Sequence, residues 1–431
     1  MTAPGDPGSL EFLGGFESTY QPAHDVDVAE TTGHVARWRD DLDLLRSCGV
    51  RRLRYPVRWH RIERERGRFD WDETDRVLGY LRDTGMHPAV DLVHNTSYPR
   101  WLRSGFADRR FPGAYVRYVE AFARRYPWVE EYTLFNEPFT TFLQCGEEGI
   151  WPPHLRGLKG FLTLARNVMP AVAEASRALR ELLPRARHLY VETCERASAG
   201  TPAGEAFAAM ANDRRFFLLD LFLGRPIAPD RPYVAEVLAV GGEAVMNMEP
   251  GVVDVLGLDY YAHCQWQYFD GTGRGTTSSP DPAPLSALIE EYWQRYGIPC
   301  VLGETNIRGY PSDRASWLKY TLEQCEVARA RGVPLEGYCW FPFVDSCDWD
   351  SRLVRSAGHI DPVGVYSIDE RLDRHPSSMS DAYRQAVGGT PSSALPAYRF
   401  HPPVDDWLRG WMPQMAHWDW LDPVQEAADR A

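Results

Sequence analysis

The sequence lacks the segments that carry a chain into or across a membrane. No apolar run is long enough to span a bilayer, and residues 1–11 contain neither the positively charged region nor the apolar run of a secretory signal. The eight cysteines are scattered, and none belongs to a C-x-x-C pair. We therefore expect a cytoplasmic protein with no membrane partner and with reduced cysteines in its core.

Motifs that hold metals, nucleotides and nucleic acids are also missing. There is no His-Glu-x-x-His segment, no G-x-G-x-x-G segment that opens a helix and no G-x-x-x-x-G-K-[ST] loop. Basic residues number 47 against 60 acidic ones, for a formal net charge of −13, and no Lys/Arg block alternates with aromatic side chains. These absences predict a protein with no metal, no cofactor and no nucleic-acid partner.

The composition is that of a globular protein with ample material for a core. The 431 residues are 44% hydrophobic and 25% charged, and 13% are aromatic, with 15 Trp. Sugars commonly stack their C–H faces on aromatic rings, although core packing explains most of this excess. The length exceeds that of the usual single core, but parallel α/β barrels reach it as one domain by lengthening their loops.

Short apolar runs alternate with amphipathic helical patterns along the chain. The runs are nearly continuous rather than alternating, which is typical of a parallel sheet covered on both faces. Eight of them predict a closed α/β barrel, the (β/α)8 or TIM barrel, with strands at residues 11–16, 51–55, 87–92, 131–135, 188–193, 253–258, 300–303 and 335–340. Helical patterns cover residues 35–48, 73–84, 114–126, 162–183, 285–296 and 316–331, and Gly49 and Gly85 follow two of them as expected for helix ends.

Two segments do not fit the β/α repeat. Residues 271–284 are rich in Gly, Thr, Ser and Pro and predict a long loop after the sixth strand, at the functional end of the barrel. We divide the chain into a catalytic barrel at residues 1–387 and a tail at 388–431 that contains Trp407, Trp411, Trp418 and Trp420. The tail is apolar enough to pack on the barrel or on a second subunit of a homo-oligomer, which we favour over a lid.

Catalytic groups of such barrels lie at the carboxyl ends of the strands. Glu137 closes the fourth apolar run and Glu304 closes the seventh, so the two carboxyls should face each other across the barrel mouth. Cleavage of a glycosidic bond needs this pair, because a protonated carboxyl delivers a proton to the leaving oxygen while an ionised one attacks the sugar. Arg54 is a candidate to keep Glu304 ionised, and apolar neighbours favour a protonated Glu137.

Each motif alone also has a structural explanation. Asn-Glu-Pro is a weak signal because Pro can simply end a strand, and an Arg–Glu pair is often a structural ion pair. His94, Tyr261 and Trp349 could each be packing residues. Together, however, the polar strand ends carry residue types that fit sugar binding and catalysis, and Asn136 can hydrogen-bond a sugar hydroxyl.

In their order and spacing these motifs resemble glycoside hydrolase family 1, over roughly residues 10–387. Leu134-Phe135-Asn136-Glu137-Pro138 is similar to the acid/base signature of that family, and Val301-Leu302-Gly303-Glu304 to its nucleophile segment. The resemblance implies a retaining β-glycosidase in which Arg54 and Tyr261 contact the nucleophile. It also implies a site for the non-reducing sugar formed by Gln21, His94, Asn95, Trp340, Asp348 and Trp349.

Several positions depart from the family pattern. The family usually has Trp at position 95, Glu at position 348 and Glu-Asn-Gly where Glu304-Thr305-Asn306 stands. An unusual sugar or aglycone is therefore expected. The Ser/Lys pattern of the phospho-sugar branch is absent after the eighth strand, so neutral sugars are favoured.

Three alternatives remain open at this stage. A retaining glycosidase of another family in the same clan would use the same chemistry. A transglycosidase would pass through the same covalent intermediate. Transfer or hydrolysis then depends on how water and an acceptor compete at the mouth of the barrel. A non-catalytic carbohydrate-binding barrel is the least favoured, since both catalytic carboxyls are present.

Overall fold

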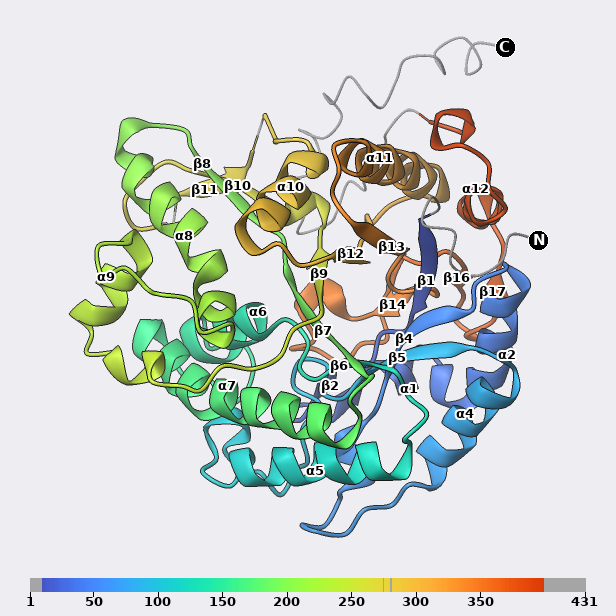
Figure 1. Ribbon diagram of the computed structural model, residues 1–431. Coiled ribbons are helices and arrows are strands. Elements are labelled where there is room, and N and C mark those ends of the chain that lie inside the picture. Colours follow the sequence, from blue (N-terminus) through green and yellow to red (C-terminus); the bar gives the residue numbers. More distant parts are fainter. Residues whose placement is uncertain (1–9, 274, 280, 399–431) are drawn as a thin grey trace.

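The structure is a computed structural model, and it describes residues 10–273, 275–279 and 281–398. Eight strands, each parallel to its neighbours, close into a barrel in the order β1-β13-β12-β9-β7-β6-β5-β4 (Figure 1). Every strand lies within two residues of its predicted range, so the (β/α)8 barrel is confirmed. The strands are β1 Glu11–Gly15, β4 Arg52–Pro56, β5 His87–Asp91, β6 Glu131–Thr133, β7 Arg187–Thr193, β9 Val255–Asp259, β12 Cys300–Glu304 and β13 Leu335–Cys339.

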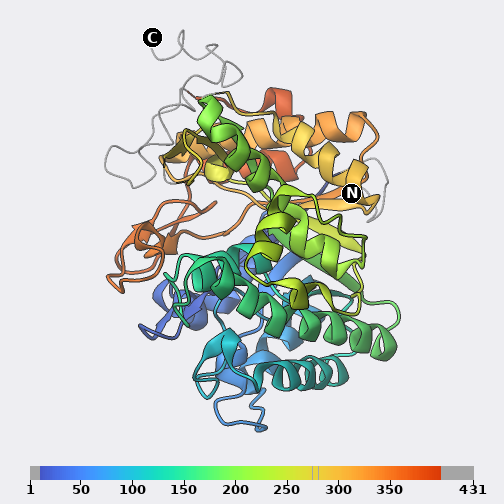
Figure 2. The ribbon, with the colours of Figure 1, turned by 90° about the vertical axis from the view of Figure 1, so that its left-hand side faces the viewer.

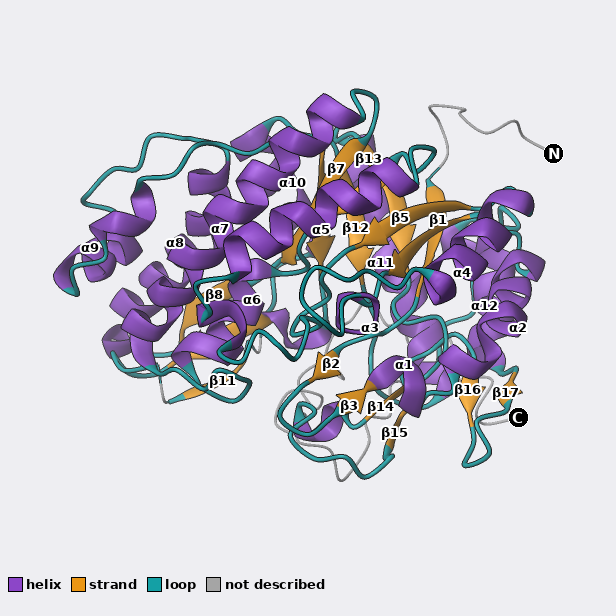
Figure 3. Ribbon diagram, turned by 90° about the horizontal axis from the view of Figure 1, so that it is seen from below, coloured by secondary structure: helices purple, strands orange, loops and turns teal. Residues whose placement is uncertain are grey.

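Helices surround the barrel strands (Figure 3). Gly49 and Gly85 follow two of them with φ of 93° and 66°, the left-handed conformation that lets the chain turn sharply into the next strand. The long helices are α2 His34–Ser47, α4 Asp72–Asp83, α5 Phe111–Arg125, α7 Gly157–Leu182, α8 Glu205–Phe222, α10 Leu285–Tyr296, α11 Pro311–Ala330 and α12 Ser378–Val387. The shorter ones are α1 Val28–Thr31, α3 Trp59–Ile62, α6 Pro138–Phe142 and α9 Pro232–Ala239.

The loops after the barrel strands contain short strands of their own, and several of these lie together on one side of the barrel (Figure 3). The segment after β13, coloured orange, extends outward in the side view (Figure 2). Part of the loop predicted at residues 271–284 is β11, which pairs with β10 in a three-stranded sheet. The short strands are β2 Tyr20–Gln21, β3 Val26–Asp27, β8 Arg196–Ala199, β10 Gln265–Tyr268, β11 Thr276–Ser278, β14 Ser346–Cys347, β15 Ile360–Asp361, β16 Ser367–Ile368 and β17 Arg374–His375.

The barrel interior is filled from its amino-terminal end. Arg52 of β4 bonds Glu131 of β6 through two nitrogens at 2.7 Å, and Arg187 of β7 bonds Glu336 of β13 at 2.6 Å. Above these ion pairs lies a buried apolar layer made of Ala89, Leu189, Val191, Val255 and Val301. This packing leaves the carboxyl ends of the strands as the place where polar side chains can meet.

The cysteines are buried thiols, as the sequence predicted: all eight are free and buried. Among the described residues, no helix combines the length and the apolar character needed to cross a bilayer. The start of the predicted tail lies against α11, where Lys319 donates to the carbonyls of Ser392 and Ser393 at 3.0 and 2.8 Å. The four tail tryptophans lie outside the described residues, so the domain division and the packing of the tail stay predictions.

Candidate active site

Glu137 follows β6 and stands at the amino end of α6 in the left-handed conformation, with φ of 42° and ψ of 63°. The end of β7 holds it in place. The carbonyl of Val191 accepts a hydrogen bond from the Glu137 N–H at 3.1 Å, and the Thr193 hydroxyl donates to Oε1 of Glu137 at 2.9 Å. A non-glycine residue in this conformation is unusual, and such strain is often found at functional sites.

Glu304 ends β12 and is 3% exposed. Its Oε1 accepts a hydrogen bond from Nη1 of Arg54 at 2.5 Å, and its Oε2 accepts one from the Tyr261 hydroxyl at 2.5 Å. Nη2 of Arg54 donates to Oδ1 of Asn136 at 2.7 Å. The contacts predicted for Arg54 and Tyr261 with Glu304 are therefore both present, and Arg54 links Glu304 to the residue beside Glu137.

The two glutamates lie close together. One carboxylate oxygen of Glu137 and one of Glu304 lie within 4.8 Å of each other. Retaining glycosidases place their carboxyl groups about 5–5.5 Å apart, whereas inverting enzymes need roughly 6.5–9.5 Å to admit a water molecule. Oxygens within 4.8 Å of each other are compatible with the spacing of the retaining class.

The environments of the two carboxyls differ. Burial and the negative charge of Glu304 raise the pKa of Glu137 to about 8, against the opposing effects of the Thr193 hydrogen bond and the charges of His94 and Arg54. Both of the main effects favour the protonated form of Glu137. Glu304, by contrast, has an arginine and a phenol hydrogen-bonded to its two oxygens.

His94 lies between two carboxylates at the same mouth. Its Nδ1 is 2.8 Å from Oδ2 of Asp91, and its Nε2 is 3.3 Å from Oε1 of Glu17. Burial opposes a charge on the ring, but Glu17 and Asp91 outweigh it and hold the pKa of His94 well above its usual range. Sequence reasoning predicted His94 but not Glu17, because nothing in the local pattern around Glu17 indicates that its side chain meets the third strand.

The other predicted sugar-site residues divide into two groups. Gln21 is buried, and neither polar atom of its side chain has a hydrogen-bond partner among the described residues. Asn95 and Trp340 are buried and already bonded, since Asn95 donates to the Thr19 hydroxyl at 2.9 Å and Trp340 donates to the Val363 carbonyl at 2.8 Å. Gln21 is thus the one of these three side chains whose polar atoms remain available to a ligand.

The carboxylate of Asp348 is hydrogen-bonded within its own loop. Its carboxylate accepts hydrogen bonds from the backbone N–H groups of Ala357, Gly358 and His359 at 3.0 to 3.2 Å. The neighbouring Trp349 packs edge-on against Trp151, with ring centroids 5.8 Å apart. Asp348 therefore organises residues 348–359, and this geometry lends no support to the predicted contact of Asp348 with a sugar.

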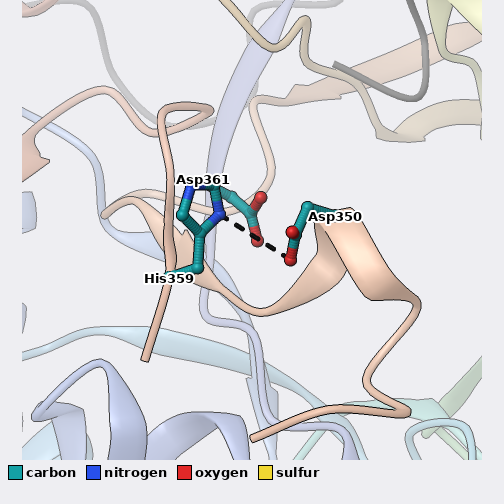
Figure 4. Close-up of side chains that lie close together, drawn as sticks. All are labelled: Asp350, His359 and Asp361. Atoms are coloured by element: carbon teal, nitrogen blue, oxygen red, sulfur yellow. Dashed lines mark ion pairs between the residues drawn. The ribbon is translucent and has the colours of Figure 1, made fainter. Parts of the chain in front are cut away.

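A second polar cluster lies in the same loop, formed by Asp350, His359 and Asp361 (Figure 4). These are ligand types that metals accept, but arginines already neutralise both carboxylates. Arg355 bonds Asp350 at 2.5 Å, and Arg308 bonds Asp361 at 2.6 Å. The cluster is an ion-pair network that shapes the loop. Glu137, Asp259 and Glu304 form the other group with metal-ligand types, and there Arg54 supplies the positive charge.

Two buried carboxyl groups that lie close together at the mouth of a (β/α)8 barrel are the arrangement that cleavage of a glycosidic bond needs. Comparison with known proteins agrees. Residues 16–299 match the model of glycosyl hydrolase family 1, and the chain belongs to this family. It is a retaining β-glycosidase, because retention is the general property of the family.

The relatives are distant in sequence but cover most of the chain. Beta-glucosidase A of Thermotoga maritima is 23% identical over 79% of this chain and 83% of its own length. The beta-glucosidase of Agrobacterium sp. is 24% identical over 78% of this chain and 82% of its own length. Among solved structures, the Thermotoga maritima beta-glucosidase in complex with glucoimidazole is 18% identical, with a TM-score of 0.74 over 89% of this chain and 99% of that one. That likeness shows the shared fold.

Proposed function

We propose that the protein hydrolyses β-glucosides or closely related neutral β-glycosides, with Glu304 as nucleophile and Glu137 as general acid/base. The observation that carries this proposal is the unequal setting of the two carboxyls. Arg54 and Tyr261 each donate to Glu304 at 2.5 Å, whereas burial and the charge of Glu304 keep a proton on Glu137.

The proposed reaction has two steps. In the first, the Glu304 carboxylate forms a bond to the anomeric carbon while the bond to the leaving oxygen breaks, and Glu137 gives its proton to that oxygen. In the second, a water molecule loses a proton to Glu137 and attacks the same carbon, which frees Glu304. Asn136, which Arg54 holds in place at 2.7 Å, is proposed to contact the sugar 2-hydroxyl.

The charge distribution favours a neutral sugar. His94 is a positive group on the predicted sugar side, and Glu17 and Asp91 both lie against it. A phosphorylated sugar would bring further negative charge to these carboxylates. One relative, from Bacillus subtilis, is named an aryl-phospho-beta-D-glucosidase and is 23% identical over 76% of this chain. We propose that the present protein does not share that preference.

A panel of aryl β-glycosides tests the proposal. The gluco, galacto, fuco and 6-phospho-gluco forms are compared by kcat/KM, and release of the sugar is measured beside its transfer to an added alcohol. We expect the neutral glucoside or fucoside to have the highest kcat/KM and the 6-phospho form to have the lowest. A dominant 6-phospho substrate would contradict the neutral-sugar proposal, and transfer exceeding hydrolysis would assign a transglycosidase.

Location and assembly are further parts of the proposal. Eight buried free thiols support a reducing compartment, so we propose the cytoplasm. The proposal of a homo-oligomer depends on the Trp-rich tail, whose four tryptophans lie outside the described residues. Light scattering of the full chain and of a chain ending at Tyr398 measures it: a smaller assembly for the shorter chain supports the tail as an interface.

A further inference from the structure

Asp259 ends β9 and brings a third carboxyl group to the two glutamates. It is 0% exposed and lies opposite Glu304 in the register of β9 with β12. A Cβ atom at Gly303 would be 2.5 Å from Oδ1 of Asp259. The carboxyl of Asp259 therefore lies over the backbone of Gly303, and the glycine leaves the space for it.

The three carboxyls share a small volume. One oxygen each of Glu137, Asp259 and Glu304 lies within 4.8 Å of the other two. Glu304 and Glu137 have donors, but neither oxygen of Asp259 has a hydrogen-bond partner among the described residues. An ionised carboxylate that is buried without a hydrogen-bond donor costs free energy, and the cost is larger beside another negative charge.

The charged and titratable groups around Asp259 come from most of the barrel strands. Burial and the negative charge of Glu304 raise the pKa of Asp259 well above its usual range, and the positive charge of Arg54 opposes them only in part. Both dominant effects favour the protonated form of Asp259. The groups that face it are Arg54, Glu137, Glu192, Cys194, Tyr261, Glu304 and Cys339.

We propose that Asp259 is a third proton-carrying carboxyl of the active site and stays neutral over the pH range in which the enzyme works. Glu137, Asp259 and Glu304 then carry one negative charge between them, beside Arg54, which also pairs with Asp91 at 3.2 Å. Asp259 acts as a positioning residue. Because it is uncharged, it adds no negative charge beside Glu137 and Glu304. The inference rests on the proposed roles of Glu137 and Glu304.

The charge balance holds through the reaction. In the free enzyme the negative charge is on Glu304. After the first step Glu304 is an uncharged ester, and Glu137, which has given its proton to the leaving oxygen, carries the charge. In the second step the proton from water returns to Glu137 and the ester bond breaks, so the charge is on Glu304 again. An ionised Asp259 would add a second negative charge to these three carboxyls in both states, although Arg54 already pairs with Asp91 as well.

The pH profile of Asp259→Asn tests this account. The amide is neutral at every pH, so we expect kcat/KM to change in height while both limbs of the profile stay within about 0.3 pH unit of wild type. An ionised Asp259 would raise the pKa of Glu137, and its removal would move the alkaline limb to lower pH by roughly one unit or more. Such a shift would overturn the proposal. Asp83→Asn, which removes an exposed charge at the end of α4, is the matched control.

A second measurement does not need turnover. In protein labelled with ¹³C at the Asp carboxyl carbons, the resonance that disappears in Asp259→Asn, or in Asp259→Ser if that variant fails to fold, belongs to Asp259. We expect it at the protonated position at pH 7. Asp41 serves as the carboxylate reference, since its bonds to His34 and Arg374 outweigh burial and lower its pKa. A carboxylate signal for Asp259 would overturn the proposal, even if no glycoside proved to be a substrate.

Both measurements are repeated with EDTA, because a bound cation is the other way in which three carboxyls can share a site. We expect no change. If the pH profile or the Asp259 resonance moves when EDTA is added, a bound cation rather than shared protons holds the three carboxyls together. That result would overturn the proposal.

Discussion

The hydroxyl of Thr193 donates a hydrogen bond to Oε1 of Glu137 at 2.9 Å, and the hydroxyl of Thr140 lies 2.5 Å from that of Thr193. This contact joins the end of β7 to the residue proposed as general acid/base. It favours the ionised form of Glu137 and thereby opposes the burial that raises its pKa to about 8.

Removal of this hydrogen bond should therefore move the alkaline limb of activity upward. Without the Thr193 hydroxyl the charged form of Glu137 is less stable, so its pKa rises further. In Thr193→Val we expect the alkaline limb of kcat/KM to lie about 1–2 pH units above that of wild type, since one hydrogen bond to a charged group is worth roughly 1.5–3 kcal/mol and about 1.4 kcal/mol corresponds to one pH unit. Thr193→Ser keeps the hydroxyl and should keep the limb in place. A limb that falls in Thr193→Val would contradict the assignment.

Replacement of Glu137 separates the two chemical roles. Glu137→Ala should lose roughly 10²–10⁴-fold with substrates whose leaving group needs a proton, and much less with activated aryl glycosides. Added azide should restore turnover by attacking the glycosyl-enzyme on the β face, which yields a β-glycosyl azide. An α-configured product would show that the intermediate does not form as proposed. Glu304→Gln serves as the comparison, since it should lose turnover of every glycoside and gain nothing from azide.

Asp348 should act on the loop rather than on the sugar. In Asp348→Ala the backbone N–H groups of Ala357, Gly358 and His359 lose their acceptor, and we expect the free energy of unfolding to fall by about 1–3 kcal/mol. The ratio of kcat/KM for glucoside and galactoside should stay close to that of wild type. Asp350→Ala, in the same loop but bonded mainly to Arg355, is the control for thermal unfolding. A large change in the sugar ratio without loss of stability would restore Asp348 as a sugar ligand.

The strands could be predicted from sequence because a parallel barrel buries both faces of each one. Runs such as residues 300–303 are apolar throughout, and the first polar side chain after such a run marks the end that faces the active site. Glu304 is the first polar side chain after its run, and Glu137 follows Asn136, the first polar side chain after residues 131–135. Asp259 also follows an apolar run, but its role could not be predicted from that position. The role depends on the closure of the barrel, which brings one of its carboxyl oxygens within 4.8 Å of an oxygen of each glutamate.

Other features of the site depend on contacts between loops that no local pattern reveals. Glu17 meets His94 across two loops, and Glu192 of β7 accepts a hydrogen bond from the backbone of Phe139 at 2.7 Å, just after Glu137. The surroundings of Asp348 also could not be predicted from a local pattern, and its position in the chain suggested a sugar contact. Its fully buried carboxylate is satisfied by a turn that forms about ten residues later.

The covalent intermediate is the central claim, and a trapped one tests it most directly. A 2-deoxy-2-fluoro β-glucoside with a good leaving group should form the glycosyl-enzyme and release it slowly, because fluorine destabilises the cationic transition states. Peptide mass spectrometry of the inactivated protein should then place one sugar on the peptide that contains Glu304, and Glu304→Gln should remain unlabelled. A label on Glu137 or Asp259, or inactivation with no covalent sugar, would contradict the account.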